Sequence, residues 1–147
     1  MEKHHIKHHD VCTIWFSITA CVKKVSGILE ELIKALGHIN FYLADADEIF
    51  AGRKEKVFDS ERIRIFLEVE MLKDIRTYTE DHKKKRNKIH DKVYRQIYES
   101  TGDSDLAECV AEDFCLLHDG QVVGYKDKWF AKFRNCYAAS VIPSGQL

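Results

Sequence analysis

The sequence predicts an all-α protein, a single-domain helical bundle of four main helices plus short helices, and three observations lead to this prediction. The chain has 147 residues, which is enough for one ordinary domain and too few for two. One proline and seven glycines leave little turn-forming sequence, which argues against a β-sandwich or barrel. Apolar residues recur every three or four positions along most of the chain, which is the spacing of amphipathic helices.

In the first half of the chain, this spacing predicts a long helix over residues 11–36 that stops at Gly37. A shorter helix is expected from about Asn40 to Gly52, followed by a basic loop at residues 53–56. Asp59 or Ser60 can cap the next helix. We expect the apolar stripe of that helix to face the core; it comprises Ile63, Phe66, Leu67, Met71, Ile75 and Tyr78.

In the second half, the polar stretch 81–88 is either a solvated helix end or a turn between two helices. Apolar periodicity resumes at Ile89 and ends at residues 100–102. Ser104 can cap a further helix, and the pair Asp119-Gly120 is a turn signal, so residues 116–125 are either helix or a small hairpin. The last helix carries an aromatic stripe that we expect to be core rather than a base-stacking or self-association surface: Trp129, Phe130, Phe133 and Tyr137.

These elements divide the chain into a His-rich segment at residues 1–10, a helical bundle domain at 11–139 and a flexible tail at 140–147. No apolar run approaches 18 residues, so we expect no membrane-spanning helix. The charged start leads into an amphipathic segment rather than a signal-peptide core, so we expect a cytoplasmic location. The five cysteines form no C-x-x-C pair and are interpreted as free, mostly buried thiols: Cys12, Cys21, Cys109, Cys115 and Cys136.

The charges are unevenly distributed, although the formal net charge is only −1. Residues 82–95 hold seven basic side chains and one acidic side chain, and residues 99–113 hold six acidic and no basic ones. A basic block of this kind can attract a phosphate backbone. Alternatively, the two blocks face each other across a helical hairpin or only solvate their own faces.

The segment K-R-N-K-I-H-D at residues 85–91 is the strongest candidate for a catalytic site. Arg86 and His90 are four residues apart and would share one face of a helix. Arginine can hold a phosphate with two hydrogen bonds, and histidine can accept or donate a proton near neutral pH. Together they would suffice for RNA cleavage without a metal ion.

In these residues the sequence resembles the HEPN superfamily, small all-α domains of which many are dimeric, metal-independent ribonucleases of toxin–antitoxin and defence systems. The resemblance implies that Arg86 and His90 are the catalytic pair, that Asn87 orients them, and that the protein is a homodimer with a cognate antitoxin or another protein as partner. The side chains expected to guide the RNA are Lys83, Lys84, Lys85 and Lys88. Three residues separate Arg86 from His90 here, whereas the family has four to six.

Two other clusters contain metal-ligating residue types, but we expect neither a metal site nor a cofactor. Asp45, Asp47 and Glu48 lack the glycine and the final acidic ligand of a calcium loop, so they are interpreted as a solvated face. A chain terminus does not preorganise ligands, so we expect only adventitious binding by its four histidines: His4, His5, His8 and His9. Phosphate-binding-loop and serine-hydrolase motifs are absent from the sequence.

The competing prediction is a non-catalytic helical module that binds another protein, with the basic block matched to an acidic surface. The two predictions differ in what they require of the structure. An enzyme needs Arg86 and His90 in one exposed cleft, whereas an interaction module needs an exposed apolar patch.

Overall fold

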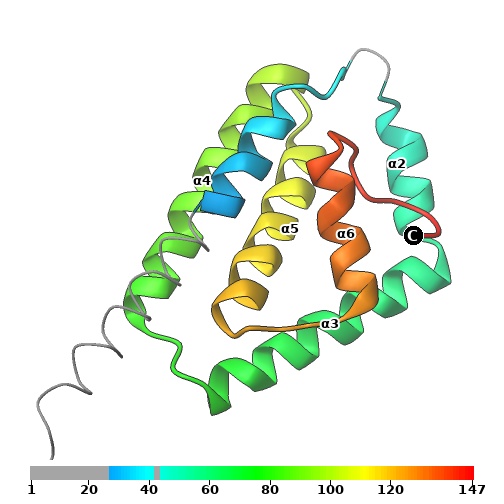
Figure 1. Ribbon diagram of the computed structural model, residues 1–147. Coiled ribbons are helices and arrows are strands. Elements are labelled where there is room, and N and C mark those ends of the chain that lie inside the picture. Colours follow the sequence, from blue (N-terminus) through cyan, green and yellow to red (C-terminus); the bar gives the residue numbers. More distant parts are fainter. Residues whose placement is uncertain (1–26, 42–43) are drawn as a thin grey trace, which may run out of the picture.

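The computed structural model describes residues 27–41 and 44–147, and these residues are helical with no strand among them (Figure 1). A helical segment at residues 27–36 precedes five helices: α2 (Ala46–Arg53), α3 (Lys56–Ile75), α4 (Glu80–Thr101), α5 (Ser104–Val122) and α6 (Lys128–Ala138). The all-α prediction is therefore confirmed, although the division into four main helices does not match in detail. The predicted His-rich segment, the first part of the long helix and Cys12 and Cys21 lie outside the described residues.

Helices α4 and α5 form an antiparallel hairpin at the centre of the domain (Figure 1). Gly102 ends α4 in the left-handed conformation with φ 71°, which glycine adopts without a steric penalty. The Asp103 side chain then accepts hydrogen bonds from the first backbone amides of α5. The segment 27–36 lies along α4, where Gln96 donates a hydrogen bond to the Ile33 carbonyl.

The core lies where α3, α4, α5 and α6 meet. Each helix contributes fully buried apolar side chains, among them Phe58, Ile65 and Val69 of α3, Val93 and Ile97 of α4, Val110, Phe114 and Leu117 of α5, and Phe133 and Tyr137 of α6. Full burial of a side chain of this size contributes about 1.5–3 kcal/mol. The prediction that the aromatic stripe of the last helix is core is confirmed for Phe130, Phe133 and Tyr137, and Trp129 packs against the same core.

Several predicted helix boundaries are wrong. The helix α2 begins at Ala46 rather than near Asn40, because the Asp45 side chain caps it by accepting from the amides of Asp47 and Glu48. The expected basic loop at 53–56 is shorter, since Arg53 ends α2 and Lys56 already begins α3. Neither Asp59 nor Ser60 caps α3, because both lie inside it.

In the second half of the chain, the polar stretch at 81–88 is helical. Of the two predicted alternatives, the solvated helix end is therefore correct and the turn between two helices is wrong. Thr79 caps α4 in a capping box with His82, and the helix continues without a break to Thr101. Residues 116–122 belong to α5, so the small hairpin is excluded. Gly120 is a helical residue that lets the ring of Phe130 approach the α5 backbone, and a Cβ there would lie 2.6 Å from Phe130 Cζ.

The segment at 140–147, expected to be a flexible tail, packs between α2 and α6 (Figure 1). Ile142 is buried, Pro143 accepts a hydrogen bond from Arg53, and the Gly145 amide donates to the Gly52 carbonyl. These contacts join the C-terminal segment to α2.

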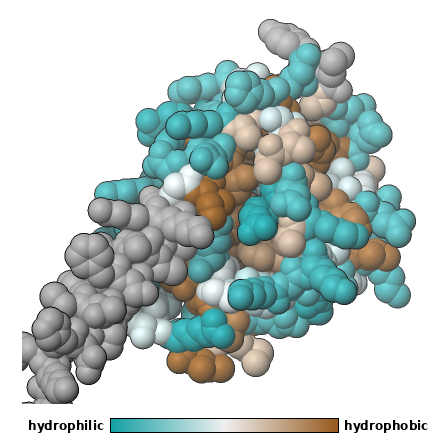
Figure 2. Space-filling model, viewed as in Figure 1, coloured by the Kyte–Doolittle hydropathy of each residue, from teal (hydrophilic) through white to brown (hydrophobic). Residues whose placement is uncertain are grey.

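The predicted core face of α3 is wrong for five of its six residues, which face outward; the sixth, Tyr78, follows the end of α3, is partly buried and packs against the core. Ile63, Phe66, Leu67, Met71 and Ile75 are 46–75% exposed. The buried face of α3 is instead formed by Phe58, Ile65 and Val69, with Leu72 partly buried beside them. Hydrophobic residues also reach the surface in Figure 2 at the lower edge, where Figure 1 places α3.

Candidate functional site

Two carboxylates of α5 organise the polar interior of the bundle, and Asp113 is the more deeply buried. Arg53 donates from Nη2 to both Asp113 oxygens at 2.7 Å, and Arg62 donates from Nε at 3.1 Å. The hydroxyl of Tyr137 donates to the same carboxylate at 2.5 Å. Burial alone would lower the pKa of Arg53, but the charge of Asp113 outweighs it and raises that pKa, so Arg53 stays charged.

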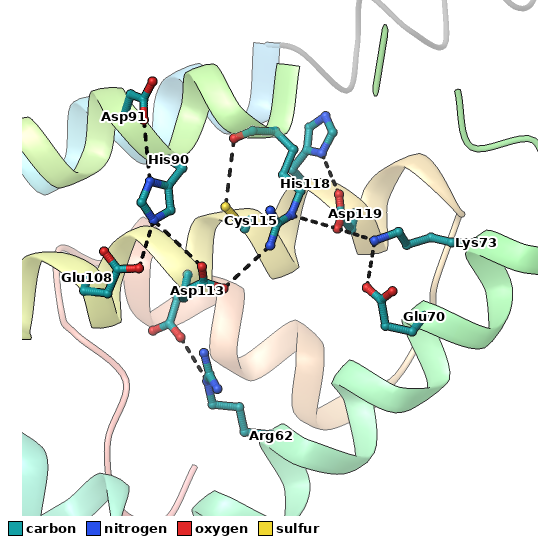
Figure 3. Close-up of polar contacts among 12 residues, drawn as sticks. Arg62, Glu70, Lys73, His90, Asp91, Glu108, Asp113, Cys115, His118 and Asp119 are labelled. Atoms are coloured by element: carbon teal, nitrogen blue, oxygen red, sulfur yellow. Dashed lines mark hydrogen bonds and ion pairs between the residues drawn. The ribbon is translucent and has the colours of Figure 1, made fainter. Parts of the chain in front are cut away.

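Asp119, nearly two turns further along α5, is the centre of a second network (Figure 3). Tyr78 donates to its Oδ1 at 2.5 Å, and the ring Nδ1 of His118 lies 2.9 Å from the same oxygen. Lys73 donates to Oδ2 at 3.0 Å. Burial by itself would raise the pKa of Asp119, but the hydrogen bonds from His118, Tyr78 and Lys73 outweigh it, so the pKa lies below its usual value.

Arg86, the predicted phosphate-binding residue, points toward α5 and is 27% exposed. Its Nε lies 3.2 Å from Asp119 Oδ2, within ion-pair distance but without the alignment of a hydrogen bond. Its Nη2 lies 3.6 Å from Glu112 Oε2. Burial lowers the pKa of Arg86, but the neighbouring negative groups outweigh it and raise that pKa. The guanidinium is thus charged and already faces two carboxylates.

His90 shares the α4 face with Arg86, as the sequence predicts, and this face is turned toward α5 (Figure 3). Its Nε2 lies 3.2 Å from Glu108 Oε1 and 3.8 Å from Glu112 Oε1. The ring stacks on Tyr94 with centroids 6.3 Å apart. Arg86 and His90 are therefore brought together, but acidic side chains of the same chain occupy the space between them.

The remaining predicted site residues of α4 stay at the surface. They are Lys83, Lys84, Lys85, Asn87 and Lys88, all exposed and without an ion pair among the described residues. The alternative that the basic and acidic blocks face each other across a helical hairpin holds for Arg86 and His90. It does not hold for these lysines, which solvate their own face.

An apolar groove lies between α3 and the α4–α5 hairpin. Ile63 and Phe66 of α3 form one wall and Leu116 of α5 lies opposite, and the pocket has a volume of about 170 Å³. Arg86 and Glu112 also line it. Beyond the groove the exposed stripe continues along α3 through Leu67, Met71 and Ile75, and these side chains with Ile63 and Phe66 are called the α3 stripe below.

Acidic side chains without ion pairs border the α3 stripe. Asp59 and Asp74 are exposed on α3 and form no ion pair in the part of the chain that is described. Two nearby cations are paired, since Arg62 binds Asp113 and Lys73 binds Asp119. Lys56 and Arg76, at the two ends of α3, are exposed and have no ion pair among the described residues, so the charges left for a partner are of both signs.

An exposed apolar stripe with a charged rim is typical of a protein-binding surface. A family model described as "Immunity protein PIM1" matches residues 28–144, so the chain belongs to this family. No curated protein and no solved structure matches it. No helix in the described part of the chain is long and apolar enough to cross a membrane.

The family match corrects the resemblance to HEPN domains, since no HEPN family matches the chain. The ribonuclease function and the RNA-binding interpretation are wrong for the same reason, and the expected homodimer loses its basis. The catalytic roles given to Arg86, Asn87 and His90 were predicted for that enzyme, and no observation tests them residue by residue. Short motifs of this kind recur by chance in lysine-rich helices.

Sequence reasoning missed the two buried aspartates and assigned the α3 stripe to the core. A signal for Asp113 was present, because apolar residues directly follow it in the helix, from Phe114 to Leu117. An acidic residue in such a stretch is rarely buried unless it is paired. Its partners Arg53 and Tyr137 lie in other helices, and single-sequence spacing does not identify them.

Proposed function

We propose that this protein is an immunity protein that binds and neutralises a cognate protein toxin. Membership of the PIM1 immunity protein family, with a match over residues 28–144, carries this proposal. This proposal takes the place of the predicted ribonuclease function. It agrees with the competing prediction of a non-catalytic helical module that binds another protein. The partner is then a toxin rather than an antitoxin.

The α3 stripe is the surface that we assign to the toxin. Five large apolar side chains on one helix are each about half exposed or more, and two of them, Ile63 and Phe66, line a groove. Patches of this kind on a small domain mark sites of protein association. The groove walled by Ile63, Phe66 and Leu116 can accept one protruding apolar side chain of the partner.

Charges of both signs surround the stripe. Asp59, Asp74 and Lys56 are exposed on α3 and have no ion pair among the described residues, and Arg86 and Glu112 both line the groove. A toxin surface that fits therefore has an apolar protrusion with charged side chains of both signs around it.

A cytoplasmic location agrees with this proposal. Cys109, Cys115 and Cys136 are free thiols, which persist in a reducing compartment. Burial raises the pKa of the Cys115 thiol to about 12 and that of Cys109 to about 11, so neither is poised for disulfide exchange.

The function is tested by growth rescue. Cells expressing a toxin domain encoded beside the gene for this chain should stop growing, and co-expression of this chain should restore growth. Binding of the purified toxin domain is then measured by calorimetry. Rescue without a stable complex contradicts neutralisation by binding. Failure of the folded chain to rescue growth from any neighbouring toxin domain contradicts the immunity function.

The surface is tested with Leu67→Asp, which places a charge in the middle of the α3 stripe. We expect the affinity for the toxin domain to fall about 30-fold or more, equivalent to about 2 kcal/mol, as for a central interface residue. The matched control is Val141→Asp. Leu67 is 55% exposed and Val141 is 54% exposed, but Val141 lies in the C-terminal segment and lines a different pocket, with Ile39 and Ala44. Equal affinities of the two variants would exclude the α3 stripe as the binding surface.

A further inference from the structure

His90, Glu108 and Glu112 bring three metal-ligating atoms together between α4 and α5 (Figure 3). His90 Nε2 lies 3.2 Å from Glu108 Oε1 and 3.8 Å from Glu112 Oε1, and the ligand atoms of all three residues lie within 4.8 Å of one another. Ligands of a tetrahedral zinc ion, each about 2.1 Å from the metal, lie about 3.4 Å apart. The two separations between His90 and the carboxylates, 3.2 and 3.8 Å, are close to this value.

Regular helices rather than loops hold the three side chains. Glu108 and Glu112 are one turn apart on the same face of α5, and both carboxylates approach His90 of α4. The two helices are locked together by buried apolar residues on either side of the cluster, including Val93 and Val110. The backbone therefore fixes the positions from which all three ligands extend.

Neighbouring groups orient the remaining atoms of two of these side chains. His90 Nδ1 faces Asp91 Oδ1 at 3.7 Å, and the ring is stacked on Tyr94, which leaves Nε2 pointing at the carboxylates. Arg86 Nη2 faces the second oxygen of Glu112, Oε2, at 3.6 Å. A carboxylate therefore lies behind the imidazole and a cation behind the ligating carboxylate, each just beyond hydrogen-bond distance.

We propose that His90, Glu108 and Glu112 form a binding site for a divalent transition metal, with Zn²⁺ as the ion that fits best. One imidazole and two carboxylates suit zinc, whereas magnesium and calcium prefer oxygen ligands alone. The side chains are 24%, 54% and 43% exposed, so the ion reaches the site from solvent. Its remaining coordination position is open to water or to a side chain of a bound partner. This site does not depend on the proposed immunity function.

To test this site, Zn²⁺ is titrated into the full chain under reducing conditions, and binding is measured by calorimetry. All samples carry alanine at His4, His5, His8 and His9, because those histidines could bind the metal on their own. We expect one ion per chain and a rise in the melting temperature on binding. Three substitutions each remove one ligand: His90→Ala, Glu108→Gln and Glu112→Gln. Loss of a residue that only orients a metal ligand costs about 10–100-fold in affinity, so each of these substitutions should weaken zinc binding by more than that.

The matched control is His38→Ala, which removes an exposed histidine outside the cluster and should leave zinc binding unchanged. Circular dichroism checks that each variant is folded. Absence of saturable binding, or an unchanged affinity in any of the three ligand variants, would overturn the site and leave an ordinary ion pair between the helices. Toxin binding is measured separately with EDTA present, so failure of the metal site and failure of the immunity function are distinguishable.

Discussion

Asp119 links three helices through side chains, and its charge makes stability depend on pH. Because the folded pKa of Asp119 is lowered, its contribution is fully present above the unfolded value of about 3.9 and is lost as the pH falls through the folded value. Asp119→Asn should lower the free energy of unfolding at pH 7 by about 2–4 kcal/mol, since Lys73 and Arg86 lose their shared anion. Urea unfolding from pH 7 to pH 3 measures this loss.

The difference between wild type and Asp119→Asn should be constant from pH 7 to pH 5 and should narrow below pH 4. A difference that persists unchanged at pH 3 would mean that the lost contribution is not that of the ionised carboxylate. Asp74→Asn is the control, because Asp74 is exposed and forms no ion pair among the described residues. That substitution should change the free energy of unfolding by less than about 0.5 kcal/mol.

For individual residues, the sequence predicted which side chains share a helix face, but it did not predict which side chains of the facing helix they contact. The shared face of Arg86 and His90 followed from their spacing and is present in α4. Their neighbours across the hairpin, Glu112 and Asp119, were not assigned, because a helix period does not determine which turn of a facing helix is opposite. The register between α4 and α5 depends on packing of the whole pair.

Among the helices, the contact between α5 and α6 depends on a glycine. A Cβ at Gly120 would lie 2.6 Å from Cζ and 3.0 Å from Cε1 of the buried Phe130 ring. We expect Gly120→Ala to reduce the free energy of unfolding by about 1–2 kcal/mol, because overpacking costs about 1–3 kcal/mol and outweighs a gain in helix propensity of about 1 kcal/mol. Urea unfolding measures the change.

Gly27→Ala is the matched control, because Gly27 is also helical and a Cβ there would meet no atom within 4 Å. It should leave stability unchanged or raise it by up to about 1 kcal/mol. The cost of Gly120→Ala should also shrink when Phe130 is replaced by leucine. Additive effects of the two substitutions would show that the contact with Phe130 is not the cause.

The sequence predicted that α3 is a helix, but the prediction of which face of α3 is buried was wrong. The helix has apolar residues on two faces, one carrying Phe58, Ile65 and Val69 and the other carrying the α3 stripe. Periodicity detects each stripe but does not distinguish a core face from a protein-binding face, since both consist of large apolar side chains. The stripe with the more regular spacing was assigned to the core, and it is the exposed one.

For the whole molecule, the fold class was predictable and the closure of the bundle was not. Long periodic segments predicted α6 and the second part of α4 with its end at Gly102, because local propensity and burial agree there. The Asp119-Gly120 pair was taken as a turn signal, although both residues are helical and buried against distant elements. The C-terminal segment has no periodicity, so its packing on α2 could not be predicted from local sequence.

The C-terminal segment should therefore matter to the stability of the entire domain. A chain ending at Ala139 loses the buried Ile142 and leaves Arg53 Nη1 without the Pro143 carbonyl that accepts its hydrogen bond at 2.9 Å. Burial of an isoleucine contributes about 1.5–3 kcal/mol and an orphaned buried donor costs about 1–3 kcal/mol, so we expect a loss of about 3–5 kcal/mol in urea unfolding. Removal of residues 146–147 alone keeps both contacts and should cost less than about 1 kcal/mol. If the two truncated chains unfold at the same urea concentration, the segment does not close the bundle.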